Sequence, residues 1–293
     1  MRLLPFFTLS AILILELLIA PQFINAQAQE LTPSALVKSV PINVPNVPSG
    51  GVSQAEYNSQ MNALKVTYRN QLGIYRTDEK TFQLAKDQYY QIQTLASLEE
   101  AVRSTRQVML SRLDVIQTYF TMAKLTLENT KGLETDVKAV TLKDLDSLST
   151  ELKIHRAAAT AASDRTGLLA VTTEFAGLDP RISTLSNKLS YLVAYGRLQT
   201  VGDKTSTIKK ELQEVVEQTE TAPLKLAERK RGLDEVQRNL NQVDQLLVKM
   251  RSQLNPVLNK DNNISSTNIS ADLSIIYGGL SRSITYLQEL VKN

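Results

Sequence analysis

The stretch LAERKRGLDEVQRNLNQVDQLLVKMRSQL, residues 226–254, carries the clearest helical pattern of this chain. Counted from Leu226 in alternating steps of three and four residues, every position through Leu254 is apolar except Arg229. The apolar positions are Leu226, Leu233, Val236, Leu240, Val243, Leu247, Met250 and Leu254. This spacing predicts the seam of a coiled coil. The helix would be roughly 43 Å long at about 1.5 Å per residue, so it needs a long partner helix.

The region from Tyr57 to Leu127 is the partner that the sequence favours. Apolar side chains recur there at helical spacing, at Tyr57, Met61, Leu64, Tyr68, Tyr75, Phe82, Ala85, Tyr89 and Ile92. After Ile92 the stripe slips by one residue, to Leu95, which indicates bundle packing rather than one uniform supercoil. We expect a break near Gly73, with Thr77 as a second N-cap, and a stop at Gly132.

The remaining helices are predicted from capping residues and prolines. We expect helices from Thr141 to Ala162 and from Asp164 to Ala176, then a restart at Asp179 and Pro180. Further helices should follow Gly202 and Pro223, and Asn255 with Pro256 should end the 226–254 helix. The sequence thus predicts an all-α fold, an elongated antiparallel helical bundle with coiled-coil segments. Its long bundle spans 54–254, and 255–293 supply a polar loop and an amphipathic helix packed on it.

The N-terminus has the layout of an exported protein. Residues 1–28 carry Arg2, an apolar run and the small residues Ala26 and Ala28, as a signal peptide does. We expect cleavage after Ala28, with Ala26 as the alternative site and an uncleaved anchor as the alternative outcome. Residues 29–53 hold four of the nine prolines and favour an extended tether, or else an edge strand. The predicted location is extracytoplasmic, either secreted or in the cell envelope.

Composition excludes several classes of function. The chain has 33 Lys and Arg, 30 Asp and Glu, one His and no Cys. Disulfides, thiolate nucleophiles, Cys-ligated zinc and iron–sulfur clusters are therefore excluded. A net charge of +3 gives no strong field for nucleic acid, so no nucleic-acid partner is expected. We expect no cofactor and no metal, and glycine spacing gives no phosphate-binding loop.

Few residues carry chemistry. His155, the single histidine, is interpreted as a packed residue at the edge of an apolar face. The acidic groups Glu99–Glu100, Asp144/Asp146 and Glu211/Glu214/Glu217 are interpreted as solvated helix faces. Weak interaction candidates are the tyrosines Tyr57, Tyr68, Tyr75 and Tyr89 and the basic run Lys225, Arg229, Lys230 and Arg231. The tyrosines fit either a half-buried seam or an exposed patch, and the basic run either a solvated face or contact with membrane or wall polymer.

The predicted function is an exported, non-catalytic scaffold or adaptor that acts through protein–protein contacts or self-association of its helices. One alternative is a small-molecule-binding or sensor bundle, for which Arg229 and His155 would be the polar groups in a cavity. A second alternative is a membrane-active helical protein. An enzyme is not expected, because the chain carries no concentrated catalytic set.

Overall fold

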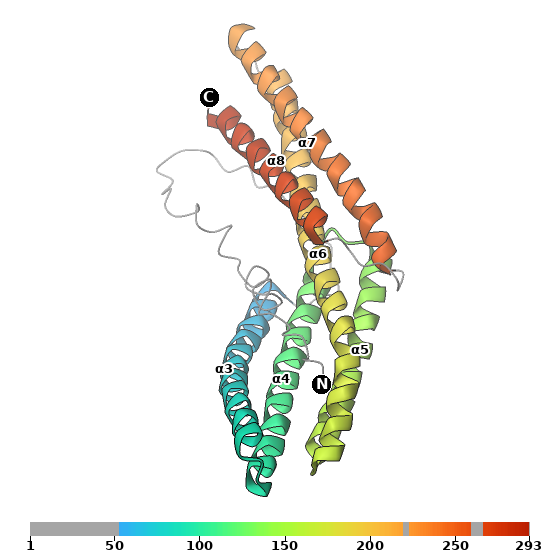
Figure 1. Ribbon diagram of the computed structural model, residues 1–293. Helices are drawn as coiled ribbons and strands as arrows, with labels where there is room; N and C mark the ends of the chain where they lie inside the picture. The colour runs from blue at the N-terminus through green and yellow to red at the C-terminus, as the bar shows by residue number, and fades with distance from the viewer. Residues whose placement is uncertain (1–52, 219–222, 259–265, 293) are drawn as a thin grey trace. The chain divides into compact units, whose positions relative to one another are not determined.

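The computed structural model describes residues 53–218, 223–258 and 266–292, and nearly all of this part of the chain is helical. Six helices follow one another: α3 (Gln54–Ile92), α4 (Leu95–Asn129), α5 (Thr135–Ala161), α6 (Arg165–Gln218), α7 (Pro223–Leu258) and α8 (Ser266–Lys292) (Figure 1). No strand occurs among the described residues, so the all-α prediction is confirmed for them. The predicted signal peptide (1–28) and nearly all of the tether (29–53) lie outside these residues and stay predictions.

The break in the first helical region lies at residues 93–94 rather than at Gly73. Ser53 caps α3 by accepting a hydrogen bond from the Glu56 backbone N–H, and the helix then runs through Gly73 without interruption. Gln93 adopts a left-handed conformation (φ 51°), and Thr94 forms a capping box with Ser97. The one-residue slip in the apolar stripe after Ile92 was therefore the signal of the turn.

Helix α4 packs on both sides. One face carries small residues seven apart, all of them buried: Ser97, Ser104, Ser111 and Thr118. Helix α3 packs against α4, and its buried face carries larger side chains at the same spacing, Met61, Tyr68, Tyr75, Phe82 and Tyr89. The opposite face of α4 is apolar, with Met109, Leu113, Phe120 and Leu127 in the core shared with α5 and α6. Because the small residues of α4 face the large side chains of α3, the two helices can approach each other closely.

The two helices after α4 differ from the prediction at their ends. Helix α4 stops at Asn129, and Gly132 in the following loop has a positive φ of 75°. Helix α5 begins at Thr135, six residues before the expected Thr141. Thr141 is buried inside α5, and its hydroxyl donates to the Val137 carbonyl. Thr141 is therefore a packed helix-interior residue, and the apparent capping motif there was misleading.

Helix α6 is one helix of 54 residues, where the sequence predicted three pieces. It continues through Gly177, Pro180 and Gly202 and is about 80 Å long at ~1.5 Å per residue. Pro180 removes one backbone hydrogen bond, a cost of roughly 3 kcal/mol in a helix interior. Phe175 and Leu185 lie buried on either side of it in the same core. Packing of the flanking turns thus outweighs the local preference for a break.

Helix α6 is shared by two bundles (Figure 1). Its N-terminal part packs with α4 and α5, and with α3 these form the first bundle. Its C-terminal part packs with α7 and α8 in the second bundle. Gly196 contacts the α4–α5 loop, whereas Gly202 contacts α7 and α8, so the change of partners falls between them. Buried side chains of both bundles form one continuous core cluster.

The partners of α7 are α8 and α6, so the expected pairing with residues 57–127 was wrong. Seven positions of its heptad stripe are buried, namely Leu233, Val236, Leu240, Val243, Leu247, Met250 and Leu254, and Leu226 is half-buried. The helix continues past Asn255 and Pro256 to Leu258. The apolar stripe of a helix determines which of its faces is buried, but it does not determine which other helix covers that face. None of the described helices is long and apolar enough to cross a membrane.

Candidate functional site

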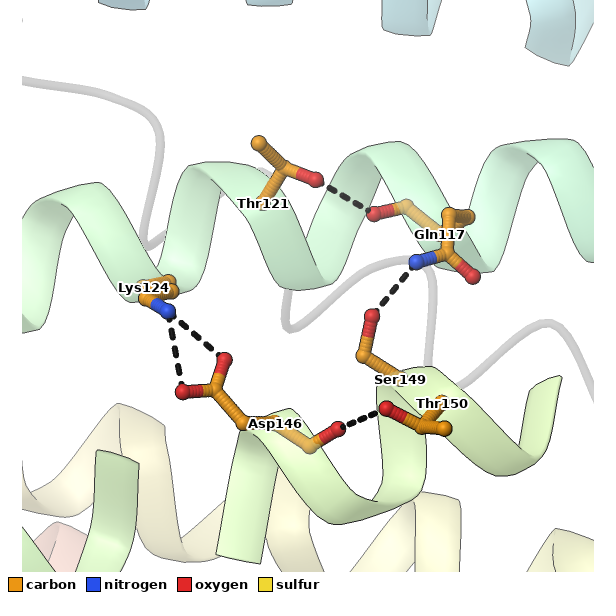
Figure 2. Close-up of polar contacts among 6 residues, drawn as sticks. All are labelled: Gln117, Thr121, Lys124, Asp146, Ser149 and Thr150. Carbon is orange, nitrogen blue, oxygen red and sulfur yellow. Dashed lines mark hydrogen bonds and ion pairs between the residues drawn. The ribbon is translucent and has the colours of Figure 1, made fainter. Parts of the chain in front are cut away.

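The α4–α5 interface carries a row of polar contacts (Figure 2). The Lys124 ammonium lies 2.7 and 2.9 Å from the two carboxylate oxygens of Asp146. The Gln117 amide donates to the Ser149 hydroxyl at 2.5 Å, and Arg156 makes a two-pronged contact with Asp114 at 2.6 and 3.2 Å. These groups are half-exposed, so each pair stabilises modestly and mainly fixes the antiparallel register of the helices. Asp146 therefore has a structural partner.

The α5–α6 interface has a second set of ion pairs with one common register. Arg181 makes a two-pronged contact with Glu151, and one of its bonds is 2.8 Å long. The hydrogen bonds from Arg181 lower the pKa of the Glu151 carboxyl. The Lys188 ammonium, on a side chain only 5% exposed, lies 2.9 Å from Asp144. Seven residues separate the two pairs on both helices, as one heptad of antiparallel packing requires.

His155 lies in this same interface and is 5% exposed. Its ring packs on Phe175 with the centroids 5.3 Å apart, and the Arg112 guanidinium lies 4.8 Å from the Phe175 ring. The His155 Nε2 atom is buried and has no hydrogen-bond partner among the described residues. Burial lowers the pKa of His155, while the nearby Glu174 carboxylate acts in the opposite direction. The sequence predicts a packed histidine at the edge of an apolar face, and the structure confirms that the side chain is packed.

A surface depression adjoins His155. It is lined by Glu151, Ile154, His155, Ala158, Glu174 and Leu178 of α5 and α6. A neutral imidazole here could accept one hydrogen bond, but Glu151 is held by Arg181 and no nucleophile lines the depression. Its chemistry suits weak binding of a small polar group. Arg229, the other polar residue predicted for a cavity, lies half-buried on α7 in the second bundle, so the two do not come together.

Two of the other acidic residues have partners along their own helices. Glu100 pairs with Arg103 one turn away, and Glu217 accepts a hydrogen bond from Gln213. Within the described part of the chain, no three His, Asp or Glu side chains lie close enough to hold a metal ion.

The weak interaction candidates divide into internal and external groups. Tyr68 is buried, and Tyr57, Tyr75 and Tyr89 are half-buried on the face of α3 that packs on α4. This is the seam arrangement rather than an exposed patch of tyrosines. In the basic run, Lys225, Lys230 and Arg231 are exposed at the start of α7. These cations remain open to a partner.

Sequence reasoning missed two features that the structure brings out. The first is the small-residue face of α4, whose signal is the seven-residue spacing of Ser97, Ser104, Ser111 and Thr118. The second is a set of exposed apolar residues on α6 and α8, also spaced by seven. Comparison with protein-family models, curated proteins and solved structures found no match to the chain. Function must therefore be argued from these faces.

Proposed function

We propose that this protein is an exported, non-catalytic helical scaffold that acts through protein–protein contacts. The observation that carries the proposal is the role of α6, which supports two bundles on one uninterrupted helix. A helix of about 80 Å can set the spacing between partners bound at its two ends. Several polar groups that could carry chemistry are engaged in ion pairs between helices, and the His155 ring packs on Phe175.

The outer side of α3 supports the proposal. Helix α3 packs along α4, and away from that seam it exposes Val66, Ile74, Leu84, Tyr90 and Ile92 by more than half each. Apolar side chains at a solvated surface are common singly, but five on one helix favour contact with another protein. We expect this helix to be one contact surface of the scaffold.

Site-specific photo-crosslinking tests the proposal. A photoreactive amino acid would replace Ile74 or Leu84 on α3 in the native host, and Lys153, an exposed residue of α5, would serve as the control position. The proposal predicts a defined protein adduct from the α3 positions, recovered with the extracytoplasmic fraction. Intact mass of the product should show loss of residues 1–28. Cytoplasmic retention, or equal diffuse labelling at Lys153, would contradict it.

The small-molecule-binding alternative is favoured by one observation, the buried and unpartnered Nε2 of His155 beside the depression. A bound ligand would be released on denaturation and detected by mass spectrometry of the purified native protein. Recovery of one compound in near-stoichiometric amount from wild type, and its loss from His155→Phe, would favour this alternative over the scaffold.

A further inference from the structure

The second bundle exposes apolar residues in two matched rows. Val201, Ile208 and Val215 are spaced by seven on α6, and Tyr277, Ile284 and Val291 are spaced by seven on α8. These six side chains are between 37% and 70% exposed. Residues seven apart lie along one line of a helix. We call the six residues the α6–α8 strip.

The two rows flank the same interface. Helices α6 and α8 pack together (Figure 1), and a Cβ on Gly202 would lie 3.9 Å from Leu280. The side of α8 toward α7 is marked by Asp272, which pairs with Lys249, and by Gly279, which lies against Val243. Viewed along α8 from its N-terminus, Leu280 lies clockwise of Asp272 and Gly279, on the side that contacts α6. Tyr277, Ile284 and Val291 lie further clockwise, beyond that contact.

The row on α6 meets them by the same geometry. In the same view, the turn around α8 from α7 to α6 is clockwise. The turn around α6 from α7 to α8 is therefore anticlockwise. Gly202, whose Cβ would lie 3.9 Å from both Leu247 of α7 and Leu280 of α8, faces the groove between these two helices. Val201 and Ile208 lie anticlockwise of Gly202, which is the α8 side. The rows therefore run side by side, with Val201 near the level of Tyr277, Ile208 near Ile284 and Val215 near Val291.

The charges beside the strip indicate what covers it. Arg197, Lys204 and Glu211 are exposed and follow α6 at the same seven-residue spacing, so the edge is basic at one end and acidic at the other. A second copy placed antiparallel about Ile208 would set Lys204 opposite Glu211 of the second copy, twice by symmetry. Val201 would face Val215 of the second copy, and the two Ile208 side chains would meet. A parallel copy would place like charges together.

We propose that the α6–α8 strip is the interface of an antiparallel homodimer centred on Ile208. An isologous two-fold contact is the commonest form of self-association, and it needs a surface that complements itself. The strip does so in both its apolar spacing and its charges. This inference deepens the proposed scaffold by naming one partner, a second copy of the chain, and would place two α6 helices side by side.

Sedimentation equilibrium of the product purified after expression of the full chain tests the proposal. We expect a dimer at about 100 µM, and we expect Ile208→Asp to raise the dissociation constant about a hundredfold or more. Ile208 is half-exposed, so this variant should keep the wild-type thermal melt. The matched control is Val248→Asp, at an exposed apolar residue of α7 outside the strip, and it should dimerise as wild type does.

Charge exchange tests the orientation. Lys204→Glu alone and Glu211→Lys alone should each weaken the dimer several-fold, and the double variant should restore it, because each new glutamate would face a new lysine. A monomeric wild type, an unaffected Ile208→Asp dimer, or a double variant no better than the singles would each overturn the proposal. A monomer would leave the scaffold itself to be decided by crosslinking at α3.

Discussion

Gly132 packs directly on the backbone of Gly196, and a Cβ on Gly132 would lie 2.3 Å from the Gly196 carbonyl oxygen. Gly132 also has a positive φ of 75°, which disfavours any other L-residue. This contact seats the α4–α5 loop on α6 at the junction of the two bundles. We expect Gly132→Ala to lower the free energy of unfolding by about 2–4 kcal/mol, from left-handed strain and the clash together.

Gly177 is the matched control for this contact. It lies inside α6, and a Cβ there would meet nothing within 4 Å. Gly177→Ala should therefore raise the free energy of unfolding by about 0.5–1 kcal/mol through higher helix propensity. Urea titrations followed by circular dichroism give both values. A Gly132→Ala cost of only about 1 kcal/mol, which the left-handed strain alone explains, would show that the loop does not touch α6.

The small-residue face of α4 should not tolerate bulk. Ser111 is buried on the α3 side of α4, so Ser111→Leu should force the helices apart and lower the free energy of unfolding by about 1–3 kcal/mol. Thr121→Leu introduces the same leucine side chain at an exposed position of the same helix and should cost little. Thermal melts of both variants decide the matter, and a Ser111→Leu melt at the wild-type temperature would place α3 elsewhere.

His155 should make stability depend on pH. Burial holds its folded pKa below the ordinary value of 6.5, so its stabilising effect is complete above pH 6.5. Below that pH, His155 is protonated in the unfolded chain but stays neutral in the folded chain. The free energy of unfolding therefore falls as the pH drops toward the folded pKa. His155→Phe removes this dependence and keeps a ring against Phe175.

The measurement compares urea unfolding at pH 7.5 and 5.5 for wild type and His155→Phe. His155 is the only histidine, so no other side chain has an ordinary pKa in that interval. We expect wild type to lose more stability than the variant between the two pH values. An equal loss in both proteins would mean that the imidazole is solvated in the folded state.

The heptad stripe of α7 predicts which substitutions there are severe. Leu240 is buried in the core, so Leu240→Asp should lower the free energy of unfolding by about 3 kcal/mol or more, through lost burial and a stranded charge. Val248→Asp, two turns along the same helix but exposed, should be nearly neutral. Matching melts for the two variants would show that Leu240 does not face a core.

Periodicity made the helices predictable, because a buried face repeats along the sequence. The α7 stripe and the slip after Ile92 both correspond to features of the structure. Local breakers were less informative. The local pattern predicts helix boundaries at Gly73, Pro180 and Gly202, yet tertiary packing keeps the helices continuous through all three residues.

The candidate surfaces were harder to predict than the helices. A search for large apolar residues overlooks a seam built on Ser104 and Ser111, because small polar residues bury no large stripe. Such a search also cannot distinguish an apolar stripe that another helix covers from one that is exposed to solvent. Ile208 and Leu212 lie one turn apart on α6 with similar side chains, and only the packing of α8 and α7 shows that Ile208 is half-exposed.

One continuous α6 joins both bundles, and a spin–spin distance across this helix tests its continuity. The chain has no cysteine, so Thr173→Cys with Lys210→Cys places labels only at these two exposed sites of α6. Thirty-seven residues of unbroken helix predict a narrow distribution near 55 Å, at ~1.5 Å per residue. A broad distribution, or one centred well below that distance, would mean that α6 breaks at Pro180 or Gly202 and that no single helix joins the bundles.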